Sequence, residues 1–152
     1  MKAVIAALAA NLGIAIAKQA YKAYLGLLGS QRWMRAYNAG ARPQRLLWAS
    51  TGTKDPKASD VLYVKSLAAP FTINTMPEAT LKALAEHGDV GATMPPDGGD
   101  SEQELARFAG AKIDIHALSK QLQDEGAKSF VKSWSDLMTV ISSKSHVLKR
   151  AS

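Results

Sequence analysis

Apolar residues recur every three or four positions through most of the 152-residue chain, which predicts a protein built mainly of helices. Near the N-terminus this spacing runs across residues 12–28 and stops at Gly29, so we expect one helix there. The apolar residues that carry it are Ile14, Ala17, Tyr21, Tyr24, Leu25 and Leu28. Ser30 is suited to cap a second helix, which Gly40 should end.

Two short segments have the composition of strands instead. Residues 45–49 (RLLWA) are largely apolar without alternation, as in a strand covered on both faces. Residues 70–77 (PFTINTMP) are rich in β-branched and aromatic side chains and are bounded by prolines. A helical segment follows each of them. This alternation predicts a parallel sheet with right-handed crossovers.

The helices that follow the two strands have recognisable starts. Residues 59–68 should form a short helix with Ser59 or Asp60 as its cap. Residues 77–88 should form a longer one, with Pro77 in its first turn, where a missing N–H does no harm.

The last third of the chain is predicted to be helical after a loop at residues 89–100. Ser101 and Glu104 have the spacing of a capping box at the start of a helix. Beyond it we expect two terminal helices, reaching to about residue 150 and broken near Gly126. Their apolar positions are Leu118, Leu122, Phe130, Trp134, Leu137 and Ile141.

Composition narrows the class of protein. A hydrophobic content of 47% with 21% charged residues is ordinary for a soluble globular domain. The absence of cysteine rules out disulfides and thiolate metal sites, and it suits the cytoplasm. The net charge of +6 invites a nucleic-acid interpretation. We do not favour it, because the basic residues are scattered and are not interleaved with aromatic ones.

The N-terminal run of alanine, isoleucine and leucine imitates a secretory signal, with an A-x-A sequence at residues 15–17. A membrane span is not expected, because the run is short and contains Asn11 and Gly13. A buried helix is favoured over a signal peptide, since the helical spacing continues across the supposed cleavage site.

Several long motifs then point to one family. The chain reads WASTGTK from the end of the first predicted strand, SDVLYV at the next helix, and NTMP at the end of the second predicted strand. This order, in residues 40–88, resembles the last two strand-helix units of transaldolases of the longer bacterial branch. Residues 13–24 (GIAIAKQAYKAY) are similar to the helix after strand six of that family, and residues 121–138 to its terminal helices. The likeness covers roughly residues 12–145.

The resemblance implies an α/β fold, the C-terminal part of a (β/α)8 TIM barrel. It would comprise strands seven and eight with flanking and terminal helices, and would be predominantly helical by residue count. Residues 1–152 would form one partial barrel domain, with barrel units at 12–88 and terminal helices at 101–150. The implied activity is transfer of a dihydroxyacetone unit between sugar phosphates in the pentose phosphate pathway, in the cytoplasm and without a cofactor.

The resemblance also implies that the chain lacks the catalytic groups. The family uses a Schiff-base lysine on strand four and carboxylates on strands one and three, which we expect upstream of Met1. We therefore assign no catalytic residue to this chain and expect it to be catalytically incomplete alone. An alternative is a non-catalytic remnant, or a helix-rich interaction protein derived from a transaldolase.

The substrate phosphate is expected at the loop after the first strand. The residues that follow a barrel strand lie at the catalytic face, and such loops bind phosphate through N–H groups, hydroxyls and a cation. Ser50 matches a serine of the family, and Thr51, Gly52 and Lys54 complete the proposed set. Other transaldolase branches carry a phosphate-binding arginine at the position of Gly52. A plain turn and helix cap is the alternative for this loop.

Asn74 and Thr75 end the second strand and are possible contacts to substrate, although Thr75 is equally suited to cap the next helix. No metal site is expected, since His87, His116 and His146 lie apart without ligand-spaced carboxylates. The expected partners are sugar phosphates in the complete enzyme, namely fructose 6-phosphate, erythrose 4-phosphate and sedoheptulose 7-phosphate. The isolated chain should bind the missing N-terminal barrel portion or self-associate, and we expect neither nucleic acid nor membrane as a partner.

Overall fold

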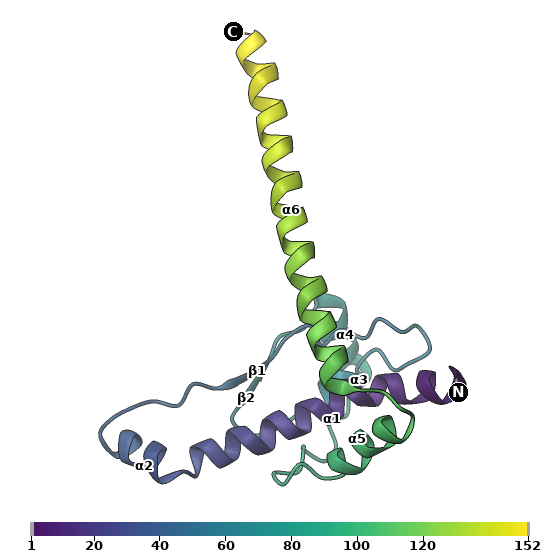
Figure 1. Ribbon diagram of the computed structural model, residues 1–152. Coiled ribbons are helices and arrows are strands. Elements are labelled where there is room, and N and C mark those ends of the chain that lie inside the picture. The colour runs from purple at the N-terminus through teal and green to yellow at the C-terminus, as the bar shows by residue number, and fades with distance from the viewer. Residues whose placement is uncertain (1, 152) are drawn as a thin grey trace. The chain divides into compact units, whose positions relative to one another are not determined.

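The computed structural model describes the backbone of residues 2–151 and the side chains of residues 11–147 (Figure 1). The chain divides into two compact units, Met1–Arg107 and Phe108–Ser152, which are described separately. The elements in chain order are α1 (Lys2–Leu28), α2 (Gln31–Asn38), β1 (Leu46–Trp48), α3 (Leu62–Ser66), β2 (Thr72–Asn74), α4 (Glu78–His87), α5 (Ser101–Gly110) and α6 (Ile115–Ala151).

The first helix, α1, is longer than predicted. It ends at Leu28, where the N–H of Gly29 donates to the Leu25 carbonyl at 2.9 Å, but it already begins at Lys2. Alanine and leucine have the highest helix propensities, so the alanine-rich start continues the helix N-terminally. The helix passes through residues 15–17 without a break, as the favoured prediction required. In the described part of the chain, no helix is both long and apolar enough to cross a membrane.

Of the caps predicted for the two short helices α2 and α3, the first is present and the second is not. Ser30 does cap α2, since its hydroxyl accepts the N–H of Trp33 at 3.2 Å. The prediction that Ser59 or Asp60 caps α3 was wrong, because Val61 occupies that position without a side-chain bond. Asp60 instead lies 3.0 Å from a ring nitrogen of His87, at the far end of α4. Asp60 is therefore engaged in a long-range hydrogen bond and does not act as a local cap.

The helix α4 begins one residue later than predicted. Pro77, with φ −60° and ψ 152°, is its N-cap and does not lie in its first turn. Glu78 and Lys82 form an ion pair of 2.7 Å along its surface, and Gly88 follows its last residue. The ion pair supports the first turns of α4, and Gly88 lies at its C-terminal end.

The two strands pair in parallel, as predicted, in the register Leu46 with Thr72 and Trp48 with Asn74. Each strand has only three residues, fewer than the apolar segments suggested, because each pairs only with the other. Phe71, with φ 61°, turns the chain immediately before β2.

The core of the first unit lies where α1 meets β1. Tyr21 and Trp48 are buried there with Leu67 and Met94. The Tyr21 hydroxyl donates to the carbonyl of Pro70 at 3.3 Å, just ahead of β2. Tyr21 of α1 therefore shares the core with Trp48 of β1 and is bonded to the chain just ahead of β2.

The start of α5 is attached to α1 by polar contacts, and the predicted capping box was wrong. The N–H of Ser101 donates to the Gly98 carbonyl at 3.1 Å, and its hydroxyl accepts from Gln19 at 2.8 Å. Glu104, the other half of the predicted box, pairs with Arg107 at 2.8 Å. Ser101 is therefore engaged by α1, and Glu104 by a neighbour within α5, in place of a capping box.

The second unit is dominated by α6, a single helix of 37 residues (Figure 1). The predicted break near Gly126 was wrong. One glycine costs only about 1 kcal/mol relative to alanine inside a helix. The turns before it carry two stabilising pairs, Lys120 with Asp124 at 2.8 Å and Gln121 with Glu125 at 2.7 Å.

Candidate functional site

The ends of β1 and β2 bring two loops to one edge of the sheet. Trp48 and Asn74 are register partners at the carboxyl ends of parallel strands, so the chain leaves both strands on the same side. Thr75 strengthens this pairing, because its N–H donates to the Trp48 carbonyl at 3.0 Å and its hydroxyl lies 3.3 Å from the same oxygen. The carboxyl edge is where open and closed parallel sheets bind ligands.

Thr51 ties the first loop to the second strand. Its side chain is only 2% exposed, and its hydroxyl lies 2.7 Å from Asn74 Oδ1 and 2.9 Å from the Thr75 carbonyl. Both partners are acceptors, so they share the single hydroxyl proton. Thr51 therefore acts as an internal link, and its proton is not available to a ligand.

Ser50 turns the chain sharply between β1 and this link. Its φ is 57°, in the left-handed region, which costs a non-glycine residue roughly 1–2 kcal/mol. The residue is exposed, so its hydroxyl is accessible from solvent. Strain of this kind is characteristic of positions whose side chain or backbone must be presented in one orientation.

Gly52 is required by close packing. A Cβ atom at this position would lie 3.0 Å from Cγ and 3.3 Å from Cδ of Pro77, and 3.5 Å from the Thr80 hydroxyl. A longer side chain here must displace the start of α4. The packing against Pro77 and Thr80 therefore favours glycine at this position.

Lys54 is the first basic residue after β1 along the chain. It is exposed and makes no ion pair within the described part of the chain. The carboxylate of Asp55 accepts the N–H of Lys57 at 2.9 Å, which closes the next turn. The Lys54 side chain therefore has no acidic partner among the described residues.

Two buried polar groups near the strand ends have no hydrogen-bond partner in the described part of the chain, and only one of the two residues was predicted from the sequence. The side-chain nitrogen of Asn74 and the hydroxyl of Thr53 are buried and have no partner among the described residues. Buried donors are almost always satisfied, so each of these groups calls for an acceptor. Asn74 was predicted as a substrate-facing residue, whereas the only signal for Thr53 was its place between Gly52 and Lys54.

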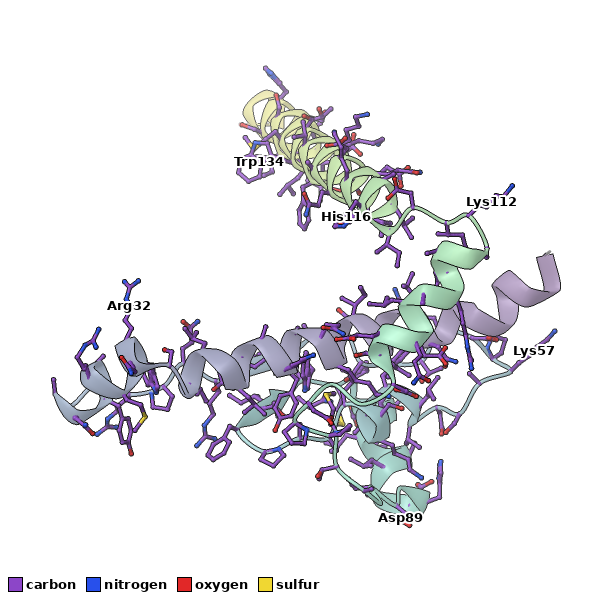
Figure 2. The ribbon with its side chains drawn as sticks, turned by 60° about the horizontal axis from the view of Figure 1, so that its bottom comes forward. Arg32, Lys57, Asp89, Lys112, His116 and Trp134 are labelled. Carbon is purple, nitrogen blue, oxygen red and sulfur yellow. The ribbon has the colours of Figure 1, made fainter. Side chains whose placement is uncertain are left out.

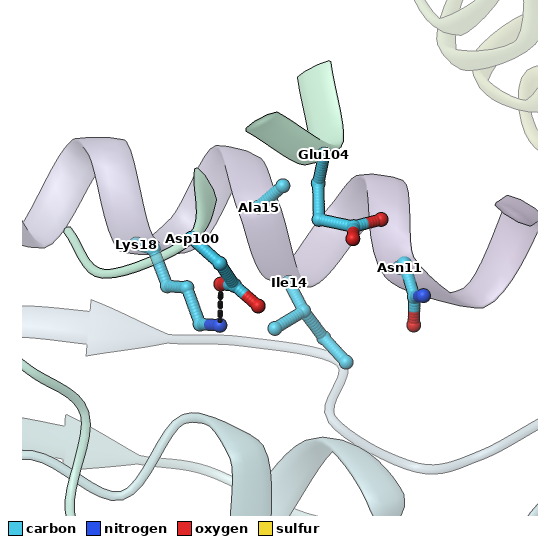
Figure 3. A pocket seen from close by; sticks show the side chains of 6 residues that line it. All are labelled: Asn11, Ile14, Ala15, Lys18, Asp100 and Glu104. Atoms are coloured by element: carbon cyan, nitrogen blue, oxygen red, sulfur yellow. Dashed lines mark hydrogen bonds and ion pairs between the residues drawn. The ribbon is translucent and has the colours of Figure 1, made fainter. Parts of the chain in front are cut away.

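The other chemical groups of the first unit do not join this site. His87 hydrogen-bonds Asp60, which holds the pKa of that carboxyl below its ordinary value. In the part of the chain that the structure describes, no cluster of three metal-ligating side chains occurs. A hollow between α1 and α5 contains no strand-end residue (Figure 3). It is lined by Asn11, Ile14, Ala15, Lys18, Asp100 and Glu104.

Comparison with known proteins identifies the family. A family model described as Transaldolase/Fructose-6-phosphate aldolase matches residues 2–141. The chain is 45% identical over 133 residues to a transaldolase of Mycolicibacterium smegmatis, which covers 87% of this chain and 36% of that protein. It is 46% identical over 136 residues to a transaldolase of Parafrankia sp., covering 89% of this chain and 37% of that protein.

A transaldolase of Thermobifida fusca is 44% identical over 133 residues, which cover 87% of this chain and 36% of that protein. The chain thus spans about a third of the length of the curated relatives it matches, and it corresponds to their C-terminal part. The resemblance seen in the sequence motifs is confirmed. This chain belongs to the transaldolase family.

Proposed function

We propose that the chain is the C-terminal part of a transaldolase-type barrel, with β1 and β2 as strands seven and eight. The whole enzyme would transfer a dihydroxyacetone unit between sugar phosphates. The family match supports the activity, and the parallel pairing of β1 with β2 supports the barrel assignment. In this proposal residues 12–88 are barrel units and the helices from residue 101 onward are terminal additions.

The loop after β1 binds the substrate phosphate in this proposal. Lys54 provides the charge and the Ser50 hydroxyl provides a hydrogen-bond donor, while Thr51 and Gly52 shape the loop. The observation that carries the proposal is the hydrogen bond of 2.7 Å from Thr51 to Asn74, which holds the loop at the carboxyl end of β2. The unpartnered amide of Asn74 would then donate to a substrate oxygen at the same edge.

The chain contributes binding and no covalent chemistry. Neither Leu46–Trp48 nor Thr72–Asn74 contains a lysine or a carboxylate, so these strands present no amine for an iminium and no group for proton transfer. Lys54 is exposed, whereas a Schiff-base lysine is activated by desolvation or by a neighbouring cation. The amine that forms the iminium would therefore come from the portion of the relatives that lies before the matched segment.

Complementation tests this function. The chain would be refolded with the portion of the Mycolicibacterium smegmatis transaldolase that precedes the matched segment, and dihydroxyacetone transfer from fructose 6-phosphate to erythrose 4-phosphate would be measured. We expect transfer from the mixture and none from either part alone. A mixture that forms a complex but remains inactive would contradict the proposal.

Paired lysine variants of the complemented enzyme test the phosphate site. Lys54→Ala should raise KM for the sugar phosphate roughly 10- to 150-fold with little change in kcat, since a charge-assisted bond contributes about 1.5–3 kcal/mol and phosphate binding is shared by ground and transition states. Lys57→Ala, an exposed lysine of the same loop (Figure 2), should leave KM unchanged. Equal effects of the two variants would show that Lys54 has no specific role.

A further inference from the structure

The hydroxyl of Thr53 is a polar group of the loop after β1 to which the proposed function gives no role. It is buried and has no hydrogen-bond partner in the described part of the chain. A hydroxyl offers one donor and two acceptor sites, and burial without a bond lowers the stability of the folded state. Groups of this kind are rare in folded proteins, and each calls for an explanation.

The backbone at Thr53 is positioned by the two residues before it. The hydroxyl of Thr51 lies 2.7 Å from Asn74 Oδ1, which ties the loop to the last residue of β2. Gly52 packs against Pro77, since an added Cβ would lie 3.0 Å from the Cγ of that proline. The chain that leads into Thr53 is therefore held at the carboxyl edge of the sheet.

The side chain of Thr53 retains one degree of freedom. The residue as a whole is only half-buried, although its hydroxyl oxygen is fully covered, so its exposed surface belongs to its other atoms. Threonine occupies staggered χ1 wells about 120° apart, and one rotation about the Cα–Cβ bond moves the hydroxyl without moving the backbone. Such a rotation is the smallest movement that can give this hydroxyl a new partner.

A second donor at the same edge lacks an acceptor as well. The amide nitrogen of Asn74 is buried and unpartnered among the described residues. Thr51 connects the two groups, because it is bonded to Asn74 and stands two residues before Thr53. The next residue, Lys54, is an exposed cation. A ligand that suits two donors and a cation offers several acceptor oxygens and negative charge, which is the chemistry of a phosphate group.

We propose that Thr53 is a further phosphate-binding residue, whose hydroxyl leaves its buried rotamer and donates to a phosphate oxygen of the substrate. This inference rests on the proposed function and adds one residue to the phosphate site. The hydroxyl is unsatisfied in the free chain and satisfied in the complex. Removing it should therefore have opposite effects on stability and on binding.

The stability of Thr53→Val separates this role from a structural one. Valine has nearly the shape of threonine and lacks the hydroxyl, so without phosphate the variant chain should melt about 2–4 °C higher than the unaltered chain. Thr51→Val is the matched control, because the same exchange there removes a bonded hydroxyl and should lower Tm. If Thr53→Val leaves Tm unchanged or lowers it, the hydroxyl is bonded within the chain or to a buried water, and the proposal is overturned.

The kinetics of the complemented enzyme test the contact with phosphate. Thr53→Val should raise KM for fructose 6-phosphate roughly tenfold or more with little change in kcat, since a hydrogen bond to phosphate is shared by ground and transition states. The inhibition constant of inorganic phosphate, used as the probe, should rise by the same factor. Thr53→Ser keeps the hydroxyl and should retain the KM of the unaltered enzyme. A rise in KM without a rise in the inhibition constant would show that Thr53 does not contact phosphate.

Lys54→Ala separates failure of this inference from failure of the phosphate site. If Lys54→Ala raises KM and Thr53→Val does not, the loop binds phosphate without Thr53, and this inference alone is overturned. If neither variant changes KM, the phosphate site itself is wrong and the inference falls with it. If Thr53→Val raises both Tm and KM while Thr53→Ser keeps the KM of the unaltered enzyme, Thr53 has the proposed role.

Discussion

The Thr51 hydroxyl lies 2.7 Å from Oδ1 of Asn74, so a loop residue after β1 is bonded to the last residue of β2. The two residues are separated by α3 in the sequence but adjacent at the carboxyl edge of the sheet. This bond sets the position of Ser50 on one side of Thr51 and of Lys54 on the other. The geometry of the proposed phosphate loop depends on it.

Replacement of Thr51 by valine should therefore destabilise the chain. Valine keeps the shape but leaves Asn74 Oδ1 without its donor, and an unsatisfied buried group costs about 1–3 kcal/mol. Thr51→Ser retains the hydroxyl and should cost less. In a thermal melt we expect Thr51→Val to lower Tm by about 2–4 °C for each kcal/mol lost. Equal melting temperatures for the two variants would indicate that the hydrogen bond contributes nothing.

Gly52 should not tolerate a side chain. A Cβ atom 3.0 Å from Pro77 forces a shift, and overpacking of this kind typically costs about 1–3 kcal/mol. Gly110→Ala is the matched control, since an added Cβ there meets nothing within 4 Å. Urea unfolding should show a loss of stability for Gly52→Ala only. Adding Pro77→Ala should recover part of it, and failure of this rescue would locate the strain elsewhere.

The attachment of α5 to α1 should weaken in acid. The hydrogen bond from Lys18 lowers the pKa of the Asp100 carboxyl, and the one from Lys22 lowers that of Glu102. A carboxyl whose pKa is lower in the folded state adds stability above its unfolded pKa, and this contribution is lost as the pH falls through the folded value. Both contributions should therefore be present at pH 7 and disappear below about pH 4.

Removal of the two carboxyl charges tests this directly. An Asp100→Asn, Glu102→Gln chain should melt at a lower temperature than the unaltered chain at pH 7, and the difference should shrink toward pH 3. Glu86→Gln is a suitable control, because Glu86 makes no ion pair in the described part of the chain. A difference that persists unchanged at pH 3 would rule out the ion pairs as its cause.

The continuity of α6 predicts the response to substitutions at Gly126. Gly126→Ala should raise the helicity and the stability of α6 by about 1 kcal/mol, because alanine is the better helix former and an added Cβ meets nothing within 4 Å. Gly126→Pro should break the helix and reduce the circular dichroism signal at 222 nm. If alanine lowered the helicity, the helix would have to be broken at this point in solution.

The sequence predicted the features that depend on local pattern. Strand pairing followed from the alternation of strands and helices, and the Ser30 cap followed from residue type next to a periodic segment. The features that depend on distant residues were missed. The capping box at Ser101 failed because Gln19 binds its hydroxyl, and the cap at Asp60 failed because His87 is its partner. Neither partner can be identified from spacing along the chain.

In the candidate site too, the features set by local pattern were predicted and those set by distant residues were not. The sequence pattern placed Asn74 at the end of one strand and Ser50 and Lys54 after the other, and the two strands do end at one edge of the sheet, because they are parallel. The binding roles of these residues stay a prediction. The pattern could not assign Thr51 to an internal bond or explain Gly52, since both depend on the approach of a neighbouring strand and helix. Hydroxyl and glycine residues in such a loop serve either binding or packing, and only their contacts distinguish the two.

Borohydride trapping with fructose 6-phosphate tests the central claim most directly. Reduction converts an iminium into a stable three-carbon adduct on the lysine that formed it, which mass spectrometry locates. We predict no adduct on any lysine of residues 1–152, either alone or in the complemented enzyme, and an adduct on the added portion of the Mycolicibacterium smegmatis protein in the active mixture. An adduct on Lys54 of this chain would contradict the account, because the loop after β1 would then carry the covalent chemistry itself.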